Sequence, residues 1–78
     1  MRNLDLGFVP KDVYICRTYD EAHETRELAC ANWAGIRDRG RVRQGWVILR
    51  HLERGFYAVV DVDTAQLGVF PVDYSREG

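Results

Sequence analysis

The densest group of residues suited to chemistry is a run of arginines between positions 37 and 43. Arg37, Arg39, Arg41 and Arg43 alternate with other residues around Gly40. The arginine guanidinium is a planar fork of donors that matches phosphates and carboxylates, so this loop is suited to gripping a nucleic-acid backbone or an acidic protein surface. The same residues also fit a solvated turn, in which Arg37 and Arg39 balance the C-terminal dipole of a helix.

A second charged group is acidic and consists of Asp20, Glu21, Glu24 and Glu27. Carboxylates near a helix N-terminus are favoured by the helix dipole, which explains the first three residues without any function. As a surface, Glu24 and Glu27 could instead meet an Arg- or Lys-lined channel on a partner. Both interpretations stay open, and they are compatible.

The soft metal ligands of the chain are His23, Cys30, Cys16 and His51. Seven residues separate His23 from Cys30, about 10.5 Å along a helix, whereas the ligands of one zinc ion lie only a few ångströms apart. We therefore predict no metal site and no bound cofactor.

Catalytic groups are equally sparse. Asp61-Val62-Asp63 has the alternating carboxylates that begin a calcium loop, but the glycine and terminal glutamate of that loop are missing. Ser75 is the only serine, and a nucleophile needs a base and an oxyanion donor within reach. The sequence predicts no catalytic site, so we expect a protein that is not an enzyme.

Length and composition narrow the class further. A chain of 78 residues accommodates one domain, here 1–78, and its 46% hydrophobic and 29% charged residues are typical of a packed core. The net charge of -1 argues against general attraction to polyanions. No apolar run is long enough to span a bilayer, and the first residues lack the apolar stretch of a secretion signal. We expect a cytoplasmic protein.

The first half of the chain predicts an arm, a strand and a helix. Residues 1–12 have no sustained period and are expected to form an irregular arm, followed by a β-branched strand over 13–17. Thr18 and Glu21 have the spacing of a capping box at a helix start. Apolar residues at helical spacing then predict an amphipathic helix that ends near Arg37, with mostly small buried residues and Trp33 as its large anchor.

The second half predicts strands. Segments 42–52 and 56–62 flank a short connection with Gly55, the pattern of a hairpin. After a turn at 63–66, a strand over 67–70 is limited to an edge by Pro71, and 73–78 is expected to fray. The predicted fold is α+β, in the order βαβββ, with one amphipathic helix on a mainly antiparallel sheet of three to four strands.

The hairpin register decides which side chains meet the helix. A three-residue turn places Trp46 and Ile48 on one face with Ala58 and Val60, whereas a two-residue turn matches Val47 and Leu49 with Val60. Either register leaves large apolar groups on both faces, and one helix covers only one of them. The second face is then covered by the arm and tail, buried in a homodimer, or used to dock another protein.

This architecture resembles that of small phage-encoded inhibitors of host defence, the anti-CRISPR proteins. The resemblance covers the strand over 13–17, the capped helix over 19–37 and the hairpin over 46–62, and it lies in the arrangement of elements without any shared motif. It implies a binding protein that sterically blocks a subunit of a CRISPR-Cas effector. Many such inhibitors are strongly acidic DNA mimics, from which this chain departs at a net charge of -1.

The sequence thus favours a non-enzymatic inhibitor or adaptor that binds a protein partner. The expected partner-binding residues are Arg37, Arg39, Arg41, Arg43, Glu24, Glu27, Tyr57 and Asp61. Two alternatives stay open: a small nucleic-acid-binding module that uses the arginine loop, and a structural phage assembly subunit that buries its sheet face in a homo-oligomer.

Overall fold

The computed structural model describes residues 9–33, 37–38, 41–42, 45–66 and 73–77. The elements are β1 (Val13–Cys16), α1 (Tyr19–Trp33), β2 (Arg37–Asp38), β3 (Arg41–Val42), β4 (Trp46–His51), β5 (Tyr57–Asp61), α2 (Val62–Gln66) and β6 (Tyr74–Glu77). The predicted strand over 67–70 and the residues before position 9 lie outside these ranges.

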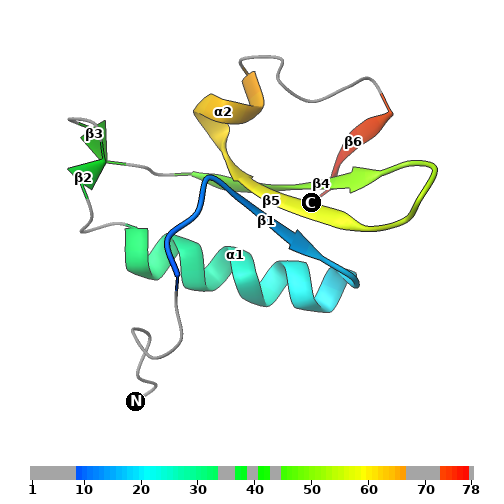
Figure 1. Ribbon diagram of the computed structural model, residues 1–78, viewed down its shortest axis with the longest axis horizontal. Helices are drawn as coiled ribbons and strands as arrows, with labels where there is room; N and C mark the ends of the chain where they lie inside the picture. The colour runs from blue at the N-terminus through cyan, green and yellow to red at the C-terminus, as the bar shows by residue number, and fades with distance from the viewer. Residues whose placement is uncertain (1–8, 34–36, 39–40, 43–44, 67–72, 78) are drawn as a thin grey trace.

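Four strands form one antiparallel sheet in the order β1-β5-β4-β6. The main helix, α1, lies along one face of this sheet, and the short helix α2 lies on the other side (Figure 1). The predicted α+β fold, one main helix on an antiparallel sheet, is confirmed.

The start of α1 has the predicted cap. The Glu21 backbone N–H donates to Thr18 Oγ1 at 3.1 Å, and the Glu21 carboxylate accepts from the backbone N–H of Arg17 at 2.8 Å. In the usual capping box this carboxylate would accept from the N–H of Thr18 itself. Both bonds satisfy backbone donors at the point where the chain turns from β1 into the helix.

The predicted end of the helix near Arg37 is wrong. Arg37 belongs to β2, which pairs antiparallel with β3 so that Arg37 lies opposite Val42 and Asp38 opposite Arg41. The two residues between the paired strands are Arg39 and Gly40, and a glycine in a two-residue connection favours a hairpin. Arg37 therefore does not complement the dipole of a last helical turn.

The predicted strand over 42–52 is divided at Gly45. This glycine has a φ of 69°, in the left-handed region, and its C=O accepts a 2.7 Å hydrogen bond from the N–H of Val62. A Cβ at this position would lie 3.3 Å from Cγ2 of Val62. Only glycine meets both conditions without strain, so the change of direction before β4 depends on it.

The β4–β5 hairpin has a four-residue loop, 52–55, closed by hydrogen bonds from His51 N–H to Phe56 C=O (2.8 Å) and from Gly55 N–H to His51 C=O (2.9 Å). Val47 pairs with Val60, and Leu49 with Ala58. The register of a three-residue turn is therefore wrong. Side chains alternate between the two faces along a strand, so a four-residue loop and a two-residue turn place the same side chains on the same face. The four-residue loop therefore keeps the side-chain orientation that the two-residue alternative predicted.

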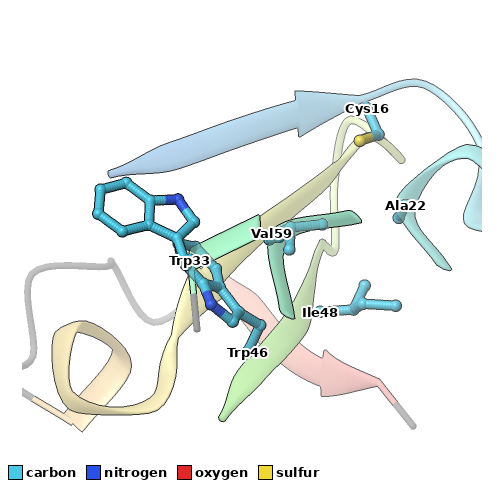
Figure 2. Packing of buried hydrophobic residues seen from close by; sticks show 7 residues of the cluster. Cys16, Ala22, Trp33, Trp46, Ile48 and Val59 are labelled. Carbon is cyan, nitrogen blue, oxygen red and sulfur yellow. The ribbon is translucent and has the colours of Figure 1, made fainter. Parts of the chain in front are cut away.

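The core between α1 and the sheet is built on small helical residues and two tryptophans (Figure 2). Ala22 and Ala29 are fully buried, so the helix backbone approaches the sheet closely, as predicted. Trp33 from α1 and Trp46 from β4 fill one end of this space, with ring centroids 6.1 Å apart.

The central strands of the sheet are also buried on its second face, within one chain. Val47, Leu49, Ala58 and Val60 form a second apolar cluster, against which Val62, Ala65 and Tyr74 pack, among others. Of the alternatives predicted for this face, cover by other parts of the same chain is the one that these contacts support, with Tyr74 of the tail and residues of α2 as the cover. A homodimer or homo-oligomer that buries this face loses its structural support.

The predicted fraying is wrong for Tyr74–Glu77. These residues form β6 and pair with β4 from Ile48–Glu77 to His51–Tyr74. The N–H of Leu52 adds a 2.7 Å hydrogen bond to the C=O of Asp73. The short polar segment folds because β4 offers it a row of backbone donors and acceptors, which local sequence patterns do not reveal.

Candidate functional site

The predicted partner-binding residues lie on three separate elements. Glu24 and Glu27 are exposed on α1, where the Glu27 carboxylate lies 3.9 Å from His23 Nδ1. Tyr57 on β5 is half-buried, and its ring packs against that of Tyr19 at 5.9 Å between centroids. Asp61 is 0% exposed, so its assignment to a partner surface is wrong. The register places Asp61 opposite Trp46, on the face that α1 covers.

The arginine run is carried by the β2–β3 hairpin. This hairpin is a sheet of its own and lies beyond the C-terminal end of α1, away from the four-stranded sheet (Figure 1). Arg37 and Arg41 lie on its two strands, whereas Arg39 and Arg43 lie outside the described residues. The structure thus brings two of the four arginines onto one small hairpin.

The two cysteines have different surroundings. Cys16 is buried under α1, and its Sγ lies 3.5 Å from Thr25 Oγ1, to which it donates. Burial raises the pKa of the Cys16 thiol, a nearby Glu21 carboxylate adds to the rise, and the Thr25 contact partly offsets it. Cys30, in contrast, is exposed on α1. In the described residues, no group of three or more metal-binding side chains occurs.

We expect a thiol reagent to modify Cys30 rapidly and Cys16 slowly in the native protein at neutral pH. The reactive species is the thiolate, and the raised pKa keeps Cys16 protonated while burial blocks access. The rate at Cys16 should increase as the pH rises towards its pKa. Peptide mass mapping measures both sites, with Cys30→Ser as the control. Equal native rates would contradict the burial of Cys16.

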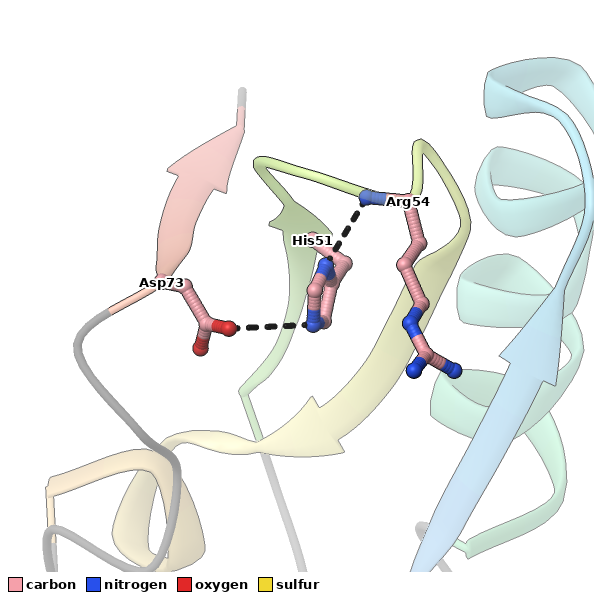
Figure 3. A network of polar contacts seen from close by, with 3 residues as sticks. All are labelled: His51, Arg54 and Asp73. Carbon is pink, nitrogen blue, oxygen red and sulfur yellow. Dashed lines mark hydrogen bonds and ion pairs between the residues drawn. The ribbon is translucent and has the colours of Figure 1, made fainter.

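A polar cluster centred on the buried side chain of His51 is a feature that the sequence did not reveal. Its Nδ1 accepts a 3.1 Å hydrogen bond from the backbone N–H of Arg54, and its Nε2 lies 3.2 Å from Oδ2 of Asp73 (Figure 3). The imidazole contacts the rings of Phe56 (4.8 Å) and Tyr74 (4.9 Å). In the sequence, His51 stood out only as an isolated metal-ligand type. The sequence does not show that Asp73 and Tyr74 are partners of His51, because they lie next to it only when β6 pairs with β4.

The chemistry of His51 is constrained by these contacts. Because Nδ1 accepts from an amide, the neutral ring carries its proton on Nε2, which then donates to Asp73. Ser75 follows Tyr74 in β6 and therefore points to the opposite face of the sheet. The cluster thus joins the loop 52–55 to β6 without bringing this serine to the histidine.

A second feature that sequence reasoning missed is the apolar side chain on the outer strand of the sheet. Among the described residues, β1 has a strand neighbour on one side only, β5. Ile15 lies in this strand opposite Ala58 and is 62% exposed. Its neighbours Tyr14 and Cys16 face α1, so strand alternation directs Ile15 to the other face. A polar residue would be expected at an edge position that stays in water.

These features define a small α+β domain, with an arginine hairpin, an acidic helix surface and an apolar edge strand. None of the protein-family models, curated proteins or solved structures compared with the chain matches it. No helix in the described ranges is long and apolar enough to cross a membrane.

Proposed function

We propose that this chain is a protein-binding domain that acts as a non-enzymatic inhibitor or adaptor, with β1 as its principal contact. The observation that carries the proposal is the exposure of Ile15 in the middle of an outer strand. Outer strands present backbone donors and acceptors along one side, and an extended segment of another protein can pair with them. Soluble proteins usually protect such edges with charge, a bulge or a covering segment.

Among the described residues, the charged side chains next to β1 in the sequence stand at its two ends. Asp12 precedes the strand and Arg17 follows it, and both are exposed. Between them, Ile15 offers an apolar side chain beside the small Ala58, which is fully buried. An incoming strand would gain backbone hydrogen bonds from β1 and an apolar contact with Ile15. The edge therefore combines the two contributions on which strand addition depends.

Charged surfaces on other elements supply secondary contacts in this proposal. The β2–β3 hairpin with Arg37 and Arg41 would meet acidic groups, and the exposed Glu24 and Glu27 would meet basic groups. The proposed partner is a CRISPR-Cas effector subunit that the domain blocks sterically. The support for this partner class is the architectural resemblance to small phage inhibitors: a strand, a capped helix and a hairpin without a shared motif.

We expect Ile15→Glu to abolish partner binding while leaving the fold intact. Ile15 is exposed, so the substitution should change the free energy of unfolding by no more than about 0.5 kcal/mol. A charge at the centre of a protein interface should weaken binding by about 30-fold or more. The measurement is affinity capture from a bacterial lysate with mass spectrometry, followed by titration of the captured protein.

Leu52→Glu is the matched control, because Leu52 is a comparably exposed aliphatic residue on a different element, the loop 52–55. Partner binding should survive this change. If Ile15→Glu folds and binds as tightly as the unmodified protein, β1 is not the contact. If capture returns no effector subunit but another protein that Ile15→Glu loses, the binding proposal stands and the CRISPR-Cas assignment fails.

Nucleic-acid binding is the second candidate, favoured by the separation of the arginine hairpin from the main sheet. It requires an affinity for single- or double-stranded DNA or RNA that falls steeply with salt, since neutralised phosphates release counterions. A gel-shift series that begins at low salt distinguishes the candidates. Binding at low salt that Arg37→Ala and Arg41→Ala reduce would favour this function, and no binding would remove it.

A further inference from the structure

We propose that His51 is a proton-sensitive clamp between the loop 52–55 and the start of β6. Protonation of its imidazole would release the loop at Arg54 and retain the contact to Asp73. The inference concerns a conformational device in the fold, and it does not depend on the proposed partner or on β1.

The clamp follows from the hydrogen-bonding positions of the imidazole. Nδ1 faces the Arg54 backbone N–H at 3.1 Å, which is a donor, and Nε2 faces the Asp73 carboxylate at 3.2 Å, which is an acceptor. The neutral ring with its proton on Nε2 satisfies both partners. The charged ring has a donor at each nitrogen, so it has no lone pair left for the Arg54 N–H. Two N–H groups would then face each other, whereas the contact to Asp73 would become an ion pair.

Packing leaves the ring little freedom to avoid this conflict. His51 is buried, and the rings of Phe56 and Tyr74 contact it at centroid distances of 4.8 and 4.9 Å. These neighbouring rings restrict rotation of the imidazole. The two opposed N–H groups would therefore separate by a movement of the least constrained backbone segment. The loop is that segment, since its residues from Leu52 to Gly55 are all exposed.

The charged and titratable groups around the ring come from both adjoining segments. On the β6 side they are the Asp73 carboxylate, the Tyr74 hydroxyl and Arg76, which lies two residues along the same face. In the loop, Glu53 and Arg54 are both exposed. Phe56, which lies between the loop and β5, contributes a ring without charge. Asp73 is thus the group at ion-pair distance that favours the charged imidazole, and the Arg54 amide is the one that opposes it.

The released state would keep part of the present framework. The hydrogen bond from Leu52 N–H to Asp73 C=O and the pairing of β4 with β6 do not involve the imidazole nitrogens. Only the loop would change, and with it the presentation of Leu52, a large apolar side chain that is already half exposed. Acidification would therefore alter one surface loop without unfolding the sheet.

The test follows the Arg54 amide and the His51 ring by nuclear magnetic resonance between about pH 5 and 8, where histidines commonly titrate. At the upper end, the ring nitrogen shifts should show a neutral imidazole protonated on Nε2. As the ring becomes charged, the protection factor of the Arg54 amide should fall about tenfold or more, as expected when a buried hydrogen bond is lost. The Leu52 amide should stay protected.

Two substitutions at the same position separate the roles of the two nitrogens. In His51→Asn, the side-chain oxygen lies near the place of Nδ1 and does not titrate, so Arg54 should stay protected at every pH. In His51→Gln, the amide reaches towards Asp73 and leaves no acceptor for Arg54, so protection should be low throughout.

Three results would overturn the proposal. One is a neutral ring protonated on Nδ1. Another is Arg54 protection that stays constant while the ring titrates. The third is the same pH-dependent loss of protection in His51→Asn as in the unmodified protein. The first two need no substitution, so the test holds even if a variant fails to fold.

Discussion

Replacing Trp46 by alanine is expected to remove most of the stability of the fold. Trp46 is 3% exposed and packs between Trp33 (6.1 Å) and Tyr14 (5.8 Å, edge to face), where β4 meets the end of α1. Truncating a buried aromatic residue costs about 3 to 5 kcal/mol, and a domain of this size is stabilised by only about 5 kcal/mol or somewhat more. Urea denaturation followed by circular dichroism measures the loss.

The control for Trp46→Ala is a pair of phenylalanine variants. The Trp33 indole N–H donates to Tyr14 Oη at 3.1 Å, whereas the Trp46 indole N–H is buried and has no hydrogen-bond partner among the described residues. Trp33→Phe loses this bond, and Trp46→Phe loses none. Trp33→Phe should therefore cost about 1 kcal/mol more than Trp46→Phe. A reversed order would contradict the arrangement of the two indoles.

Removing residues 73–78 is expected to have an effect of similar size. The deletion takes away β6, which pairs with four residues of β4, and the Tyr74 ring that packs against His51 and Phe56. It also removes the carboxylate and the carbonyl of Asp73, which hold His51 and the N–H of Leu52. Lost apolar burial and lost hydrogen bonds should together lower the free energy of unfolding by at least about 3 kcal/mol.

A frayed tail would make the opposite prediction, because its removal would leave stability unchanged. Thermal unfolding of the shortened and full chains decides between the two. Arg76→Ala is the control, since Arg76 lies in β6 with an exposed side chain and should change stability by no more than about 0.5 kcal/mol. The loss of stability in Tyr74→Ala should lie between that in Arg76→Ala and that in the shortened chain. An unchanged melting temperature in the shortened chain would contradict the β6 pairing.

Short sequence patterns predicted the parts of the fold that depend on interactions between residues close together in the sequence. The Thr18–Glu21 spacing places the start of α1, and the small residues Ala22 and Ala29 indicate its close approach to the sheet. A glycine at position 55 marks the β4–β5 turn, where it has a φ of 79°. These features depend on neighbours within about one helical turn or one hairpin, which is the range of such patterns.

The surface proposed for binding was harder to predict, because it depends on register and on strands distant in sequence. Asp61 was expected on a partner surface, but the four-residue loop turns it towards α1 and buries it. Ile15 drew no attention as a site, since nothing in residues 13–16 shows that β1 is an outer strand. Whether a side chain is exposed depends on how the strands assemble into the sheet. Because side chains alternate between the two faces along a strand, a small error in the predicted register assigns them to the wrong face.

By itself, the sequence determined the class of the protein: a single small α+β domain with one capped helix, a β4–β5 hairpin and a tryptophan-anchored core. Composition, capping and hydrophobic period act over short distances and need no knowledge of the fold. Only the tertiary structure decided that residues 74–77 form a strand, that the central strands are covered on the second sheet face and that His51 meets Asp73. Each of these depends on segments brought together across more than 20 residues or on the parity of one loop, which local patterns do not encode.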